Sequence, residues 1–168
     1  ALAQDPYNNA TIYYGSQFLH KSTDKGSTWE IISPDLTTND PTKQKQHESG
    51  GLTMDATGAE NHCTILTIAP STVKQGVIWV GTDDGKIQVT QDGGKTWSDV
   101  SAKITGMPKG AWVPQIQTSK FNSGEAFVVV NNYLGADPMW RNCSRYISDL
   151  DRCRLQPRFL GIGRCGYR

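Results

Sequence analysis

The chain has 168 residues, enough for one ordinary domain, and its 17 Lys and Arg against 16 Asp and Glu give a formal net charge of +1. That balance provides no general field to attract nucleic acid or an anionic membrane, and no apolar run approaches the roughly 20 residues of a membrane-spanning helix. Residues 1–6 have neither the basic region nor the apolar core of a signal peptide. We expect any export signal to lie upstream of this sequence.

Short alternating runs separated by turn residues follow one another along most of the chain, as in an all-β meander. Residues 11–32 hold three such runs. A complete group of four runs occupies residues 64–100, and residues 112–131 hold the first two runs of a third group. The sequence therefore predicts a repeated unit of short antiparallel strands.

One octet occurs twice, at residues 22–29 and 90–97, and reads Ser/Thr-x-Asp-x-Gly-x-Thr-Trp in both copies. The Asp residues are 92 − 24 = 68 positions apart, and residues 12–16 align with 78–82 upstream of the octets. Asp accepts backbone hydrogen bonds in turns, Gly takes positive φ, and Trp opens the returning strand with a large apolar face. We predict structural roles for Ser22, Asp24, Gly26, Trp29, Thr90, Asp92, Gly94 and Trp97.

The octet resembles the Asp-box, or bacterial neuraminidase repeat (BNR), of sialidases, sortilins and related β-propellers. Over about residues 5–132, and most clearly in 22–37 and 76–97, the chain is similar to bacterial sortilin N-terminal-like or glycosyl-hydrolase repeat proteins. The resemblance implies an all-β, incomplete Asp-box β-propeller of about two to three blades of antiparallel four-stranded sheet, within the about four to eight blades of a closed ring. It also implies an exported bacterial protein, either periplasmic, secreted or at the cell surface.

A long polar insertion, residues 33–62, separates the first two groups of strands. Such long loops inside compact folds tend to be functional or disordered. The resemblance implies that connections between blades emerge opposite the octet hairpins, together with the turn at 82–85. We expect a ligand face built by residues 33–62, 82–85 and 101–112. The candidate residues on it are Glu60, His62, Asp83, Asp84 and Trp112.

Each candidate also has a purely structural explanation. Asp83 and Asp84 lie in Asp-Asp-Gly, an ordinary tight turn. Glu60 and His62 could form a satisfied loop pair before a strand, and Trp112 could pack within a blade. A sialidase is disfavoured, because Arg best holds a substrate carboxylate and the expected propeller part contains no Arg. The Phe/Tyr-Arg-Ile-Pro signature of sialidases is also missing.

Two functions therefore stay open. One is an interaction scaffold that binds peptide or glycan through an aromatic-lined surface with a polar rim. The other is a propeller glycoside hydrolase acting on polysaccharide, with catalytic acids mostly outside this sequence. Hydrolysis usually needs two carboxylates about 5 to 9.5 Å apart whose pKa values differ. We expect no cofactor and no metal, because the spacing of the three C-terminal Cys fits no common zinc pattern.

The composition changes abruptly at Met139. All seven Arg follow that residue and all ten Lys precede it, and three of the four Cys also follow it. We expect residues 139–168 to be foreign to the fold, for instance a frameshifted reading of the real continuation, and residues 1–138 to form the partial propeller. A basic arm for nucleic acid is the alternative explanation. The fourth cysteine, Cys63, is expected to be a small buried apolar group.

Overall fold

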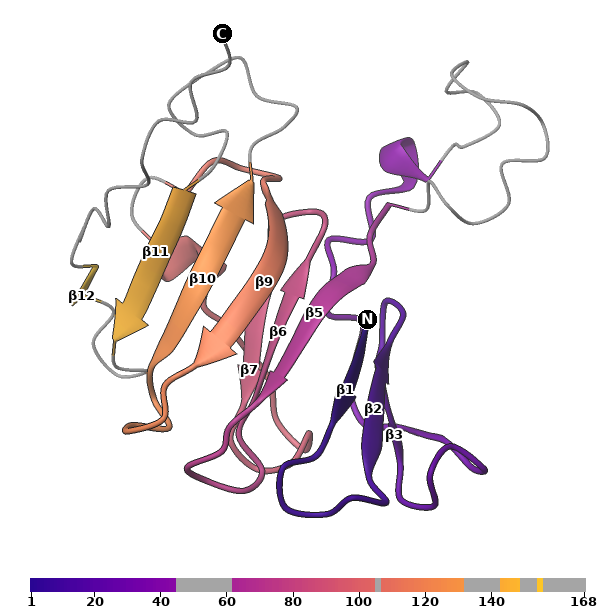
Figure 1. Ribbon diagram of the computed structural model, residues 1–168. Helices are drawn as coiled ribbons and strands as arrows, with labels where there is room; N and C mark the ends of the chain where they lie inside the picture. Colours follow the sequence, from indigo (N-terminus) through magenta and orange to yellow (C-terminus); the bar gives the residue numbers. More distant parts are fainter. Residues whose placement is uncertain (45–61, 105–106, 132–142, 149–153, 156–168) are drawn as a thin grey trace, which may run out of the picture.

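The computed structural model describes residues 1–44, 62–104 and 107–131, together with the backbone of residues 143–148 and 154–155. These residues form three antiparallel sheets of four strands each and contain no α-helix (Figure 1). In every sheet, strands that follow one another in the chain also pair with one another. The all-β meander predicted from the alternating runs is therefore confirmed.

The strand bounds follow the turn signals of the sequence. The first sheet consists of β1 (Leu2–Gln4), β2 (Ile12–Gly15), β3 (Leu19–Ser22) and β4 (Glu30–Ile31). The second sheet consists of β5 (Ile65–Pro70), β6 (Ile78–Thr82), β7 (Ile87–Thr90) and β8 (Ser98–Asp99). The third sheet consists of β9 (Trp112–Thr118), β10 (Ala126–Asn131), β11 (Cys143–Ser148) and β12 (Arg154–Leu155). Two single 3-10 turns, η1 (Pro41–Lys43) and η3 (Ser101–Lys103), lie in the connections between sheets.

Two of these strands differ from the sequence-based expectation. β1 was not expected, because three residues are too few to show an alternating pattern, yet Leu2, Ala3 and Gln4 pair with β2. β11 pairs with β10 along five residues, beyond the compositional change at Met139. Residues 132–142, 149–153 and 156–168 lie outside the described part of the chain. The separation of 139–168 from the fold therefore stays a prediction.

The sheets are packed face to face in chain order, with β5 against β1 and β2, and β9 against β5 and β6. We call the side of a sheet that faces the preceding sheet its front face, and the other side its back face. The core between the first and second sheets contains Tyr13, Leu19, Leu36, Ile65, Ile68, Ile78 and Val80. The core between the second and third sheets includes Ala69, Val77, Trp79, Ile87, Val89, Val113, Ile116, Ala126, Val128 and Val130.

Two glycines at equivalent positions of β2 and β6 allow this close packing. A Cβ placed on Gly15 would lie 2.7 Å from Ile65 Cβ, and one placed on Gly81 would lie 2.5 Å from Val113 Cγ1. Ile65 opens the second sheet and Val113 lies near the start of β9, so each glycine admits the first strand of the next sheet. The second sheet is consequently covered on both faces, and every residue of β6 is buried.

Candidate functional site

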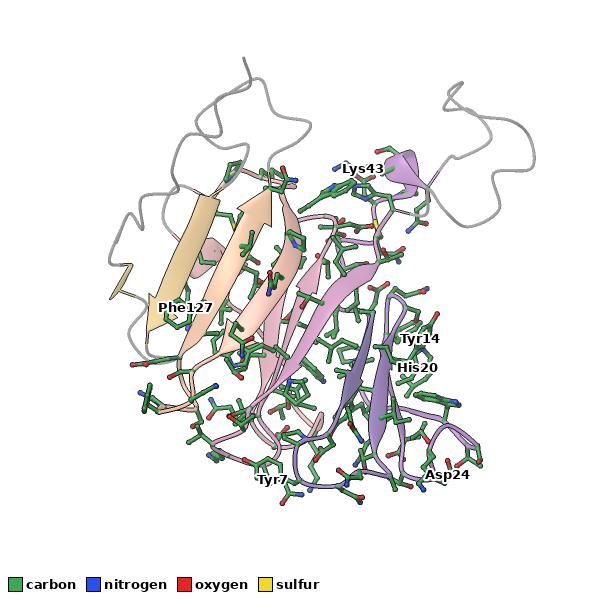
Figure 2. All side chains as sticks on the ribbon, in the orientation of Figure 1. Tyr7, Tyr14, His20, Asp24, Lys43 and Phe127 are labelled. Atoms are coloured by element: carbon green, nitrogen blue, oxygen red, sulfur yellow. The ribbon has the colours of Figure 1, made fainter. Side chains whose placement is uncertain are left out.

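The sheets have two distinct ends. One end carries both octets and the β5–β6 and β9–β10 turns, and we call it the octet face. The other end, the loop face, carries the β2–β3 and β6–β7 turns and the connections that join one sheet to the next. Figure 2 shows Asp24 and Lys43 at these opposite ends. The candidate residues whose positions are described therefore lie opposite the octets.

The first octet closes on itself through the Asp24 carboxylate. The N–H and hydroxyl of Thr28 donate to Asp24 Oδ1 and Oδ2 at 2.9 and 2.7 Å, and the Ser22 hydroxyl donates to Oδ1 at 2.8 Å. The Gly26 N–H donates to Ser22 Oγ, and Trp29 Nε1 donates to the Gly26 carbonyl. The hydrogen bonds from Thr28 and then Ser22 lower the pKa of Asp24 to about 2.

The second octet repeats this arrangement bond for bond. Thr96 donates to both oxygens of Asp92, Thr90 donates to Oδ1, and Trp97 Nε1 donates to the Gly94 carbonyl at 3.0 Å. The pKa of Asp92 is likewise lowered, chiefly by the hydrogen bonds from Thr96. The polar groups of both octets therefore stabilise a hairpin, and both oxygens of each carboxylate accept hydrogen bonds within the octet.

On the loop face, Asp83 fastens the turn between β6 and β7 to the start of β5. The Thr64 N–H donates to Asp83 Oδ1 at 2.8 Å, and the Thr64 hydroxyl donates to Oδ2 at 2.9 Å. The Asp83 N–H returns a bond to the Thr64 carbonyl at 3.0 Å. Because the side chain is buried and both oxygens are engaged, Asp83 acts as a clamp within the second sheet.

Asp84 forms a second clamp, which holds the insertion (residues 33–62) to the second sheet through Thr38. The Thr38 N–H and hydroxyl both donate to Asp84 Oδ2, at 2.6 and 2.8 Å, and the Thr82 hydroxyl donates to Oδ1. Burial alone would raise the pKa of Asp84, but these hydrogen bonds, with one from Cys63, outweigh it and hold the pKa below its ordinary value. Asp84 is therefore an ionised hydrogen-bond acceptor and cannot serve as a proton donor near neutral pH.

The first part of the insertion begins between the first and second sheets. Leu36 is 1% exposed, and its N–H donates to the Gln17 carbonyl at 3.0 Å. Further along, the Asp40 side chain caps η1. The Lys43 ammonium reaches the connection before β9, where it would lie 3.5 Å from a Cβ on Gly110. The insertion thus brings a cation to the loop end of the third sheet.

The other candidates are placed differently. Trp112 opens β9 on the loop face with 37% of its surface exposed. His62 is half-buried, and its Nδ1 lies 3.6 Å from Cys63 Sγ. Cys63 is a buried free thiol whose neighbours include the polar side chain of Thr38. Glu60 lies outside the described residues, so the expected pairing with His62 stays a prediction.

A shared feature of the loop-face acids was not foreseen from the sequence. Every Asp on the described part of that face accepts a hydrogen bond from a Ser or Thr hydroxyl. The pairs are Asp35 with Thr37, Asp40 with Thr42, Asp83 with Thr64, Asp84 with Thr38 and Thr82, and Asp99 with Ser101. Asp99 also binds the Lys86 ammonium at 2.6 Å. The D-x-T/S spacing of three of these pairs was a signal for such turns.

Within the described residues, no group of three or more His, Cys, Asp and Glu converges closely enough to bind a metal ion. The expectation of no metal and no cofactor stays a prediction. The same part of the chain holds no helix of a length and hydrophobicity that would cross a bilayer.

Comparison with solved structures finds the same arrangement of sheets in GH74 enzymes, which are β-propeller glycoside hydrolases. The GH74 xyloglucanase from Xanthomonas campestris matches with a TM-score of 0.57 at 20% identity, over 88% of this chain and 20% of that structure. The fold is an incomplete β-propeller. A GH74 enzyme from Niastella koreensis matches with a TM-score of 0.55 at 19% identity, over 92% and 20% of the two chains.

An ancestral GH74 enzyme is similar at a TM-score of 0.52 and 14% identity, over 78% of this chain and 13% of that one. At these identities the likeness concerns the fold alone. No protein-family model matches the sequence, and a search among curated proteins finds no match. This propeller fragment thus spans between about an eighth and a fifth of the length of the structures that it resembles.

Proposed function

We propose that this chain forms three blades of a β-propeller glycoside hydrolase that acts on a polysaccharide, and that its loop face is part of the glycan-binding surface. The observation that carries the proposal is the likeness to three GH74 propeller enzymes, one of them a xyloglucanase, over 78% to 92% of the chain. A polysaccharide is too large to cross a membrane, so this function would place the protein outside the cytoplasm. Because the formal net charge is only +1, we also propose that the protein does not bind nucleic acid.

The described residues support a binding role more than an acid–base role. A glycosidase needs one carboxyl group with a raised pKa to protonate the leaving oxygen. Asp83 and Asp84 are buried and engaged, and the pKa of Asp84 is lowered. We therefore propose that the catalytic acids lie outside the described part of this chain, in the same protein.

Trp112 is the residue that we propose contacts the glycan. An indole offers a broad apolar face with one polar edge, which suits the flat, apolar faces of a sugar ring. Trp112 lies on the first strand of its sheet, at the loop end, and is 37% exposed. The nearby connection brings the Lys43 ammonium to the same end, where it can bind sugar hydroxyls.

We further propose that the two octets are Asp-boxes, as in bacterial BNR and sortilin-like repeat proteins. Their matched bonds, with Asp in the turn and Trp closing on the glycine carbonyl, support this assignment. In this proposal the octets hold hairpins on the side away from the ligand, as the resemblance implies.

The test is a calorimetric titration of the wild type and of Trp112→Ala with a xyloglucan oligosaccharide. We expect about tenfold weaker binding of the variant, or about 1.4 kcal/mol. Phe121→Ala is the matched control, because Phe121 is 94% exposed but lies in the β9–β10 turn of the octet face. Equal losses for both variants, or no binding by the wild type, would contradict the proposal.

A non-catalytic scaffold that binds glycan or peptide is the second candidate. The observation that favours it is the engagement of every described loop-face Asp by a Ser or Thr hydroxyl. Reducing-end release from xyloglucan by the full-length protein separates the two candidates. Hydrolysis supports the enzyme, whereas binding without hydrolysis supports the scaffold.

A further inference from the structure

Three turns on the octet face, one in each sheet, are built by the same hydrogen bonds. They join β1 to β2, β5 to β6 and β9 to β10, and Figure 1 shows them at the same end of the sheets. Each turn begins with a buried polar residue whose side chain accepts from the backbone N–H groups two and three positions further on. These residues are Asp5, Ser71 and Ser119. The N–H of each also donates to the carbonyl six positions further on, which closes the turn.

The residue two positions after that buried residue is apolar and exposed in all three turns. Tyr7, Val73 and Phe121 are 45%, 43% and 94% exposed. Only their backbone N–H groups take part in the turn, so the turn geometry does not require an apolar side chain at this position. In the described structure, every large apolar residue that is exposed outside the strands and octets lies here. The three side chains therefore form one set, which we call the turn tips.

The formal charges around the turn tips cancel. The two octets and the three turns together hold four lysines and four carboxylates. The lysines are Lys25, Lys74, Lys95 and Lys120, and the carboxylates are Asp5, Asp24, Asp92 and Glu125. A surface without net charge has no field that would attract nucleic acid or an anionic bilayer. The turn tips therefore fit an uncharged partner.

The chemistry of the turn tips suits the flat surface of an uncharged polysaccharide. Aromatic rings pack on the apolar faces of sugar rings, and Tyr7 and Phe121 supply such rings on the first and third sheets. The exposed amides of Asn9 and Gln75 lie in the same turns, where they can bond to sugar hydroxyls. Because neighbouring sheets are roughly 10 Å apart, a rigid flat surface contacts all three tips at once. A short soluble chain would lose conformational entropy on bridging them.

We propose that the octet face is a second polysaccharide-binding surface, which holds the protein to an insoluble, uncharged polysaccharide through Tyr7, Val73 and Phe121. The loop face, at the opposite end of the sheets, then binds the soluble chain that the proposed enzyme cleaves. That the partner is a polysaccharide rests on the proposed function. The repeated exposure of the turn tips does not depend on it.

The test measures adsorption of the full-length protein to microcrystalline cellulose, with xyloglucan oligosaccharide in excess to occupy the loop face. We expect the double variant Tyr7→Ala/Phe121→Ala to adsorb at least about tenfold more weakly than the wild type. Trp112→Ala, on the loop face, should adsorb to cellulose like the wild type, and the double variant should keep its affinity for the soluble oligosaccharide. Equal adsorption of the double variant and the wild type, or no adsorption of the wild type, would overturn the proposal.

A gain of binding separates recognition from misfolding. Val73→Trp adds an aromatic ring to the middle turn tip, and because Val73 is exposed, the larger side chain extends into solvent without disturbing the core. We expect this variant to adsorb to cellulose about threefold more strongly than the wild type. Adsorption that does not increase in a variant with an unchanged Tm would contradict the proposal.

Two further outcomes identify the partner. Co-sedimentation with phosphatidylcholine vesicles that is lost in the Tyr7→Ala/Phe121→Ala variant would assign the turn tips to a lipid surface and overturn the proposal. A wild type that neither binds the soluble oligosaccharide nor hydrolyses xyloglucan, yet adsorbs to cellulose through the turn tips, would contradict the proposed activity and support this surface.

Discussion

The first and second octets have the same hydrogen bonds, yet they lie in different surroundings. Both close through an Asp that accepts from a Thr N–H and hydroxyl, with distances that agree within 0.1 Å. Trp97 also contacts the preceding sheet, whereas Trp29 is 44% exposed. Hairpin geometry is therefore fixed locally, and burial is decided by the neighbouring sheet. Whole sheets differ in the same way, since the described residues cover the second sheet on both faces and the first sheet on one.

The largest expected effect follows from removing a side chain that a neighbouring sheet covers. Trp79 on the back face of β6 is fully buried, while Phe127 at the equivalent position of β10 is 49% exposed. We expect Trp79→Ala to lower the free energy of unfolding by about 3–5 kcal/mol. Phe127→Ala should cost less than about 1 kcal/mol. Urea denaturation measures both, and equal losses would show that the third sheet does not cover Trp79.

The next effect concerns the clamp that fastens the insertion to the second sheet. Asp84→Ala leaves the N–H and hydroxyl of Thr38 without their acceptor, which should cost about 2–3 kcal/mol. Asp40→Ala removes a similar but exposed cap and should change stability much less. Limited proteolysis of the insertion, read beside the urea midpoint, tests this prediction. Faster cleavage in the Asp40 variant than in the Asp84 variant would contradict it.

Acid should destabilise both octets in the same way. The folded-state pKa of Asp24 is about 2 and that of Asp92 is also lowered, against about 3.9 in the unfolded chain. Their contribution to stability is therefore complete above about pH 5 and is lost as pH falls toward 2. Asp24→Asn and Asp92→Asn should each flatten the decline of Tm between pH 5 and 2. A decline that is unchanged in both variants would exclude these carboxylates as its source.

The smallest effect on stability is expected on the front face of the first sheet, which none of the described sheets covers. Ile31→Thr in the 168-residue chain should change the free energy of unfolding by no more than about 0.5 kcal/mol, because Ile31 is 59% exposed there. For comparison, Val80→Thr changes a residue on the same face of the second sheet, places a hydroxyl in a fully buried position and should be clearly destabilising. Similar urea midpoints for the two variants would contradict the difference in burial between the front faces of the first and second sheets.

The sequence predicted the hairpins well because their bonds are local. The octet contacts join residues no more than four apart, so their residue types reveal the turn directly. β1 was missed because a strand of three residues relies on its partner for definition. The clamp between Thr38 and Asp84 joins two residues that are 46 positions apart in the sequence, and no local sequence pattern predicts it. The sequence alone therefore indicates Asp83 and Asp84 as ligand-face acids, whereas the structure shows both accepting hydrogen bonds from neighbouring Thr residues.

The local closure of the octet bears on how the chain assembles during synthesis. Loops of about ten residues close within roughly 10–100 ns, far faster than a ribosome adds residues. Each octet can therefore form as soon as it emerges, whether or not the sheet beside it has formed. Such autonomy lets a gene lengthen by whole units, because a duplicated segment carries its own nucleation site and needs only a neighbour to shield its faces.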